Sequence, residues 1–232
     1  MSSKLKESKR EAARFFVVGS PIGNLEDISF RAVRILSEVD RIFCEDTRRS
    51  LKLLNHLKIS KPLESCPYFK EEEKATRLLE CLRKGESVAF LSDAGMPGFS
   101  DPGNRLVRHC REQGFGVEVI GGVSALTSFL AGLTFELTEF HFYGFLPPKS
   151  SGRKKFWTSE SLILPCVFLE STHRLESSLE LIAELRPDLE LCLAKELSKV
   201  SEAFFQGSAK ELLDTIPSWK GEWIGLARRG SP

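Results

Sequence analysis

Short apolar runs alternate with amphipathic stretches through the first half of the chain, and this alternation constrains the fold more than any other feature. The apolar runs predict strands at 15–18, 41–44, 88–91 and 117–120, with a weaker strand near Leu63. The amphipathic stretches predict helices at 29–37, around 51–57, at 71–84 and at 105–112. Because the strands are almost wholly apolar, we expect a mostly parallel sheet that is buried on both faces.

The pattern changes after Gly121. Residues 140–145 alternate in the way an antiparallel strand does, and further strands are expected at 162–169, 189–193, 202–205 and 222–227. Helices are expected at 124–133, 175–185 and 209–216. The sequence therefore predicts an α/β protein of two lobes, a mostly parallel N-terminal lobe over 15–120 and a mixed C-terminal lobe over 121–232. Residues 1–14 are polar and basic, which is typical of a mobile tail, with an RNA-binding arm as the alternative.

The composition is ordinary for a globular protein and leaves almost no net charge. The 232 residues are 41% hydrophobic and carry a formal charge of +1. The net charge therefore does not indicate a polyanionic partner, and any surface that binds nucleic acid would be a local basic patch. The sequence shows no signal peptide and no apolar run that approaches the roughly 18 residues of a membrane span, so we expect a cytoplasmic protein without a membrane partner.

Several familiar reaction centres are missing from the sequence. The six cysteines form no C-x-x-C pair and several lie in apolar patterns, so we expect reduced core residues rather than disulfides. The four histidines are far apart in sequence and there is no H-E-x-x-H motif, so no metal is expected. No G-x-S-x-G nucleophile elbow is present, which argues against a hydrolase.

Two loops rich in glycine and proline follow predicted strands, at 19–25 and at 92–103. Both should lie at the carboxyl edge of one parallel sheet, where open α/β proteins bind ligands. Neither loop has the G-x-G-x-x-G or G-x-x-x-x-G-K-[ST] pattern, which argues against a dinucleotide or a nucleoside triphosphate. Because proline removes backbone N–H groups, the carbonyls are the more available partners, and they suit a cationic or neutral ligand. The alternative is that both loops are rigid structural turns.

Charged residues follow other predicted strands. Residues 44–48 place Glu45, Asp46 and Arg48 at a strand end, where they fit a polar site or the N-terminus of a helix with Asp46 or Thr47 as its cap. The segment 150–155 is a basic Gly/Ser loop that can contact phosphate or simply be solvated. His173, after the strand that ends at Leu169, fits a general base or a helix-cap residue.

Taken together, these motifs resemble the tetrapyrrole methylase superfamily, and more narrowly its branch that methylates a ribose 2′-hydroxyl of small-subunit ribosomal RNA. The match covers the chain from about Phe15 onward in collinear order, through motifs at 20–25 with 27–28, 44–48, 92–95 with 97 and 100–103, 144–147 with 149 and 153, 170–174, and 196–199. The resemblance implies a two-lobed α/β fold, a cleft between the lobes that binds S-adenosylmethionine, and a homodimer.

The resemblance also implies roles for particular residues. The implied cofactor contacts are Pro21, Asp93, Ala94, Gly95, Ser124, Ala125, Glu170 and Lys195, with the 92–103 loop walling the cofactor pocket. The chain departs from the family pattern at Met96, at 121–123 and at 195–198, and it stops at Pro232, where many ribosomal RNA members continue into a small helical extension.

Methylation of a ribose hydroxyl needs a group that removes its proton, because a hydroxyl is a poor nucleophile at neutral pH. The candidates are Glu45, Asp46, Glu170, His173 and Glu196, of which we favour Asp46 with Arg48 as its partner. Arg48, Lys149, Arg153 and Lys199 are candidates to hold phosphates. Two other hypotheses are a methyltransferase of the same fold acting on a small tetrapyrrole-like substrate, and a module that binds the cofactor without turnover.

Overall fold

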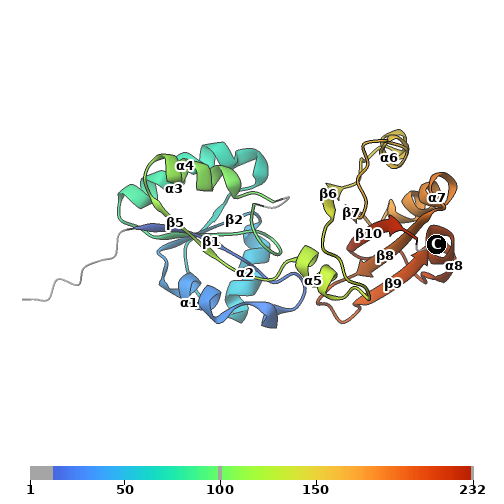
Figure 1. The fold of residues 1–232 in the computed structure, drawn as a ribbon. Coiled ribbons are helices and arrows are strands. Elements are labelled where there is room, and N and C mark those ends of the chain that lie inside the picture. Colours follow the sequence, from blue (N-terminus) through green and yellow to red (C-terminus); the bar gives the residue numbers. More distant parts are fainter. Residues whose placement is uncertain (1–12, 99–100, 231–232) are drawn as a thin grey trace, which may run out of the picture. The chain divides into compact units, whose positions relative to one another are not determined.

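The computed structural model describes residues 13–98 and 101–230 (Figure 1). These residues form two compact units, of which the first ends at Val123 and the second begins at Ser124. Most of the expected N-terminal tail, residues 1–12, lies outside the described residues. Arg14, its last expected member, begins the first strand.

The first unit is built on a parallel sheet of five strands in the order β3-β2-β4-β1-β5. The strands are β1 (Arg14–Val18), β2 (Arg41–Cys44), β3 (Leu63–Ser65), β4 (Val88–Leu91) and β5 (Gly116–Ile120). The helices are α1 (Phe30–Glu38), α2 (Thr47–His56), α3 (Glu71–Arg83) and α4 (Asn104–Glu112), with short 3-10 helices η1 (Leu25–Asp27) and η2 (Tyr68–Lys70). The prediction of a parallel sheet is confirmed.

Helices cover both faces of this sheet, which explains why its strands are apolar throughout. Phe16 and Val18 of β1 pack in one core with α1 and α2. Phe15 and Val17, which point the opposite way, pack in a second core with α3 and α4. Figure 1 shows α3 and α4 together on one side of the first sheet and α1 on the other.

The second unit contains a mixed sheet in the order β6-β7-β10-β8-β9. Its strands are β6 (His141–Phe145), β7 (Cys166–Glu170), β8 (Leu189–Lys195), β9 (Ala203–Ser208) and β10 (Trp223–Arg229), and its helices are α5 (Ala125–Ala131), α6 (Ser150–Trp157), α7 (Leu175–Leu185) and α8 (Ala209–Thr215). Residues of α6, α7 and α8 form one core with the sheet, around the fully buried Trp157 and the neighbouring Phe168. The expected mixed sheet is confirmed.

Two local predictions in this unit are wrong. The first is the antiparallel strand at 140–145: β6 pairs with β7 in parallel, because the chain returns to the sheet through the crossover helix α6. Its alternating pattern arises because one face of this edge strand is exposed. The second is the basic loop at 150–155, which is part of α6, a helix anchored in the core by Trp157.

All six cysteines are free and buried, as expected from their apolar surroundings. Burial raises the pKa values of Cys66, Cys110 and Cys166 to about 12, so these thiols are poor nucleophiles near neutral pH. Among the described helices, none is both long and apolar enough to span a membrane.

Candidate functional site

The loops that follow β1 and β4 meet at the carboxyl edge of the parallel sheet, as their positions in the sequence predict. The backbone N–H of Ser20 donates to the carbonyl of Gly95 at 2.9 Å, and the N–H of Gly95 donates back to Ser20 at 3.1 Å. The Ser20 hydroxyl is buried and donates to the carbonyl of Ser92 at 3.2 Å. The two loops therefore form one hydrogen-bonded rim.

Glycine is required where this rim approaches the end of β5. A Cβ atom placed on Gly19 would lie 2.6 Å from Sδ of Met96 and 2.7 Å from Cα of Gly122, which is closer than side chains approach. Gly95 has a φ of +75°, in the left-handed region that favours glycine. The turn formers in these loops thus allow backbone segments to pack against one another at the sheet edge.

Three acidic residues gather beside this rim. The backbone N–H of Asp46 donates to Oδ1 of Asp93 at 3.1 Å, and the backbone N–H of Asp93 donates to Oε2 of Glu45 at 3.4 Å. Arg49 forms an ion pair with Asp93, with 3.3 Å between Nη1 and Oδ2. The sheet topology therefore brings together residues that follow β2 and β4 and are 47 or 48 positions apart in sequence.

The carboxylates of this group repel one another. Burial raises the pKa of Glu45, and the negative charge of Asp93 raises it further. The hydrogen bond from the Asp93 backbone N–H lowers this pKa and offsets part of the rise. Burial also raises the pKa of Asp101 to about 6, and the charges of Glu45 and Asp93 add to the effect. A cationic ligand placed among these groups would relieve the repulsion, so the electrostatics favour a cation here.

Asp46 differs from Glu45 and Asp101 because an arginine bonds directly to its carboxylate and lowers its pKa. Its carboxylate accepts from the Arg48 backbone N–H at 2.9 Å, which caps α2, and from Nε and Nη2 of the Arg48 side chain at 3.0 and 2.6 Å. The Arg48 hydrogen bonds lower the pKa of Asp46 to about 2. The capping role expected as one reading of Asp46 is confirmed, and its role as a base stays a prediction.

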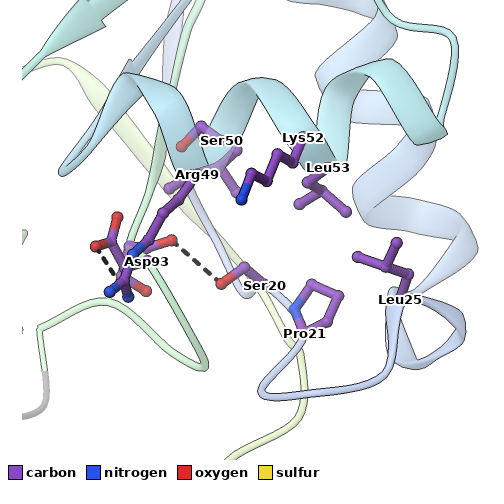
Figure 2. A pocket seen from close by; sticks show the side chains of 10 residues that line it. Ser20, Pro21, Leu25, Arg49, Ser50, Lys52, Leu53 and Asp93 are labelled. Carbon is purple, nitrogen blue, oxygen red and sulfur yellow. Dashed lines mark hydrogen bonds and ion pairs between the residues drawn. The ribbon is translucent and has the colours of Figure 1, made fainter.

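A pocket of about 200 Å³ opens beside the loop after β1 (Figure 2). Pro21 and Asp93, two predicted cofactor contacts, lie in its lining with the apolar side chains of Leu25, Leu53 and Leu91. The lining also includes Arg49, Ser50 and Lys52 from the first turns of α2, which sequence reasoning missed. Their signal in the sequence is the helix start at Asp46, because side chains of the first helical turns stay near the strand end that precedes them.

In the second unit, Glu170 is held by its own surroundings. It lies at the end of β7 and is 2% exposed. Its Oε1 accepts from the Ser171 N–H at 2.8 Å and pairs with Nη2 of Arg174 at 2.7 Å. Its Oε2 accepts from the Ser178 hydroxyl at 2.8 Å. These bonds tie the end of β7 to the start of α7.

Lys195, Glu196 and Lys199 also have partners within the second unit. Nζ of Lys195 donates to the Ser218 carbonyl at 3.2 Å. Oε1 of Glu196 accepts from the Glu222 N–H at 2.7 Å and from Nζ of Lys199 at 3.0 Å. These contacts stabilise the turn after β8, in which Glu196 adopts a φ of +53°.

The remaining predicted residues of the second unit are a buried arginine, two exposed side chains and two residues at the start of α5. Arg153 is 4% exposed and donates to the carbonyls of Pro147 and Pro148 and to the Ser177 hydroxyl. Lys149 and His173 are exposed and make no hydrogen bond to another described side chain. Ser124 precedes α5 as its N-cap residue and Ala125 begins the helix. Within the described residues, no group of three or more His, Cys, Asp or Glu side chains could hold a metal ion.

The fold and the polar edge of its parallel sheet define an α/β protein with a candidate ligand site at the strand ends. The sequence model of the tetrapyrrole (corrin/porphyrin) methylases matches residues 14–213. The chain therefore belongs to the tetrapyrrole methylase family, and it is a methyltransferase that uses S-adenosylmethionine.

Relatives and solved structures agree with this assignment. A protein of Thermotoga maritima named ribosomal RNA small subunit methyltransferase I is 42% identical over 200 residues, which cover 86% of this chain and 90% of the relative. A protein of the same name from Leptospira biflexa is 37% identical and covers 94% of this chain and 92% of its own. The uroporphyrin-III-C-methyltransferase of Thermus thermophilus superposes with a TM-score of 0.64 at 21% identity, over 93% of this chain and 94% of that one, which shows the shared fold.

The residues around the pocket of the first unit fit S-adenosylmethionine. This molecule carries a cationic sulfonium, an ammonium group and a carboxylate. Asp93, with Glu45 bonded to its backbone, can hold a cationic group, and its repulsion with Glu45 would fall on doing so. Arg49 and Lys52 in the same lining can hold a carboxylate. The apolar side chains of Leu25 and Leu53 supply contact surface for the uncharged parts.

Proposed function

We propose that this methyltransferase transfers the methyl group of S-adenosylmethionine to a ribose 2′-hydroxyl of a cytidine in small-subunit ribosomal RNA. The observation that carries the proposal is the similarity, at 37–42% identity over most of both chains, to relatives named ribosomal RNA small subunit methyltransferase I. The solved structures of tetrapyrrole enzymes are only 15–21% identical, so they support the fold and not a tetrapyrrole substrate.

S-adenosylmethionine supplies an electrophilic methyl group on a positively charged sulfur. The protein has to align the ribose hydroxyl with that methyl group and accept the hydroxyl proton as the oxygen attacks. Of the candidate bases, Glu45 has the raised pKa that makes a carboxylate a better proton acceptor. Asp46 remains a candidate, but its pKa of about 2 makes it a weak base and suits it better to hold Arg48 in place.

The remaining predicted roles form part of the same proposal. The cofactor contacts are Pro21, Asp93, Ala94, Gly95, Ser124, Ala125, Glu170 and Lys195. Glu170 and Lys195 would act mainly by fixing the backbone at the ends of β7 and β8, because their charged groups already bond to neighbouring residues. Lys149 is exposed and can reach a phosphate, whereas Arg153 and Lys199 would first have to leave existing partners. We further propose a homodimer in the cytoplasm.

The experiment is transfer of tritium from labelled S-adenosylmethionine into small ribosomal subunits from cells that lack this gene, with a tetrapyrrole precursor run in parallel. Label that maps to a ribose of the subunit RNA is the expected result. Label in the precursor alone would overturn the proposal in favour of the tetrapyrrole reading. Cofactor binding with no label anywhere would favour a module without turnover.

Variants then test the base. Asp46→Ala should abolish transfer with cofactor affinity near normal, and Asp46→Asn should separate the loss of the carboxylate from the loss of the helix cap. Glu45→Gln should lower the rate as well if Glu45 is the base. Glu73→Gln, an exposed glutamate of α3, is the matched control. Normal turnover of Glu45→Gln and Asp46→Asn would remove both carboxylates from the list of bases.

A further inference from the structure

A second pocket, of about 270 Å³, lies in the second unit, far in sequence from the acidic group of β2 and β4. It is lined by residues of β6, of α6 and of the turn after α6. The residues that matter here are Tyr143, Lys155, Phe156, Ser159 and Ser161. None of these residues is among the proposed cofactor contacts or candidate bases, so this pocket is separate from the proposed methyl-transfer site of the first unit.

One wall of this pocket is aromatic and rigid. The ring of Tyr143 meets Phe156 edge to face, with 5.0 Å between ring centroids and 86° between ring planes. Phe156 meets Trp157 in the same way at 4.9 Å, and Trp157 meets Phe168 at 5.6 Å. Because Trp157 is fully buried, this series connects the exposed Tyr143 ring to the core and holds it in place.

The phenol of Tyr143 is also fixed at its far end. Its hydroxyl oxygen accepts from the backbone N–H of Ile163 at 3.2 Å. Tyr143 is nevertheless 37% exposed, so part of this residue is available to a ligand. A planar aromatic side chain that is held at both ends and still exposed is what base stacking requires.

The rest of the pocket offers hydrogen-bonding groups and positive charge. The hydroxyls of Ser159 and Ser161 lie 2.8 Å apart in the turn after α6. Lys155 lines the pocket, and it is exposed with no ion pair to a described carboxylate. The segment 149–162 carries four basic residues and a single acidic one, Glu160. This charge is complementary to phosphate and argues for a polyanion rather than a neutral apolar ligand.

We infer that this pocket binds an unstacked nucleobase of the RNA substrate, with the base against Tyr143 and the adjoining phosphate near Lys155. The inference rests on the proposed RNA function and adds to it a site for a single-stranded nucleotide. The serine hydroxyls bond the base edge or the ribose. The pocket thus recognises single-stranded RNA, whose bases can be splayed out, and not a paired helix.

Binding of the small subunit and of a short single-stranded RNA to the full chain tests the inference. Tyr143→Leu keeps an apolar side chain but removes the ring, and it should weaken binding of both RNAs by about tenfold. Tyr143→Phe should retain stacking and stay near wild type. Lys155→Ala should lower the salt slope of binding by about 1, with Lys210→Ala on α8 as the matched exposed control. Thermal unfolding identifies a variant that has simply lost its fold.

The outcomes separate this inference from the proposed function. The expected result is a raised KM for subunits in Tyr143→Leu and Lys155→Ala, with the affinity for S-adenosylhomocysteine unchanged. Folded variants that bind and methylate subunits as the wild type does would overturn the pocket and leave the proposed function standing. A wild-type protein that neither binds nor methylates RNA would overturn the proposed function itself. Weakened binding of double-stranded RNA alone would also count against a nucleobase site.

Discussion

Replacement of Glu170 by glutamine tests whether this carboxylate stabilises the second unit. Its two oxygens accept from the Ser171 N–H, the Ser178 hydroxyl and the Arg174 guanidinium at 2.7–2.8 Å. Glutamine has almost the same size, but its NH₂ group cannot accept and it carries no charge to pair with Arg174. Removing one partner of a buried ion pair costs about 3–5 kcal/mol. Because the Arg174 side chain is 25% exposed and can turn to solvent, we expect about 2–3 kcal/mol here.

Calorimetric unfolding is the assay, because separate transitions are expected for a chain that divides into two compact units. A loss of this size should lower the melting temperature of the second unit by about 5–15 °C. Glu180→Gln, an exposed glutamate on the same α7 helix, is the matched control and should melt within about 2 °C of the parent. If Glu170→Gln and this control had the same melting temperature, the structural role would be refuted. If that variant also lost affinity for S-adenosylhomocysteine, Glu170 would be a cofactor contact.

Three further predictions concern the sheet edge and a helix cap. The raised pKa of Asp101 means that the folded state binds this proton more tightly, so stability falls as pH rises from about 4 to about 6. In urea unfolding near pH 8, Asp101→Asn should therefore have a free energy of unfolding about 1–2 kcal/mol above that of the parent, a value reduced for solvent screening because the site is partly exposed. Near pH 3 the two proteins should be equally stable. Gly122→Ala would place Cβ 2.8 Å from Cα of Gly19 and should cost about 1–3 kcal/mol in the same assay, whereas Gly121→Ala meets no atom within 4 Å and should cost far less. Ser208→Ala removes the capping box of α8 and should lower stability by about 1 kcal/mol in thermal unfolding.

The parallel sheet could be predicted because both of its faces are buried. A strand such as β4 has no solvent face, so all four of its residues are apolar and stand out from the amphipathic helices around it. The edge strand β6 has one exposed face, and its alternation is the same in a parallel or an antiparallel pair. The direction of β6 depends on the crossover through α6, whose first turns look like a basic loop in the sequence.

The polar group of the first unit could be predicted for the same reason. Once the sheet is parallel, the residues after β2 and β4 must meet at one edge, and the bonds among Glu45, Asp46 and Asp93 show that they do. The helix start at Asp46 indicates that the first turns of α2 lie near this edge, but which of their side chains, such as Arg49 and Lys52, line the pocket could not be predicted. Their place in the pocket depends on the angle at which α2 leaves the strand, and the pattern of apolar residues does not specify that angle.

The charged residues of the second unit show a different limit of sequence reasoning. A glutamate or arginine after a strand can bind a ligand or can hold two backbone segments together, and both roles select the same residue types. Arg153 and Glu196 have partners that come 24 and 26 positions later in the chain, which no local pattern reveals.

The existing hydrogen bonds and ion pairs also determine which of these side chains can contact RNA without breaking a bond inside the protein. Drawing Arg153 onto a phosphate would break bonds to two carbonyls and a hydroxyl inside the protein. Lys149 and Lys155 are exposed and give up no ion pair on binding. Since each broken internal bond subtracts from the free energy of the new contact, RNA affinity should come from such uncommitted lysines, and the buried arginine should shape the helix that presents them.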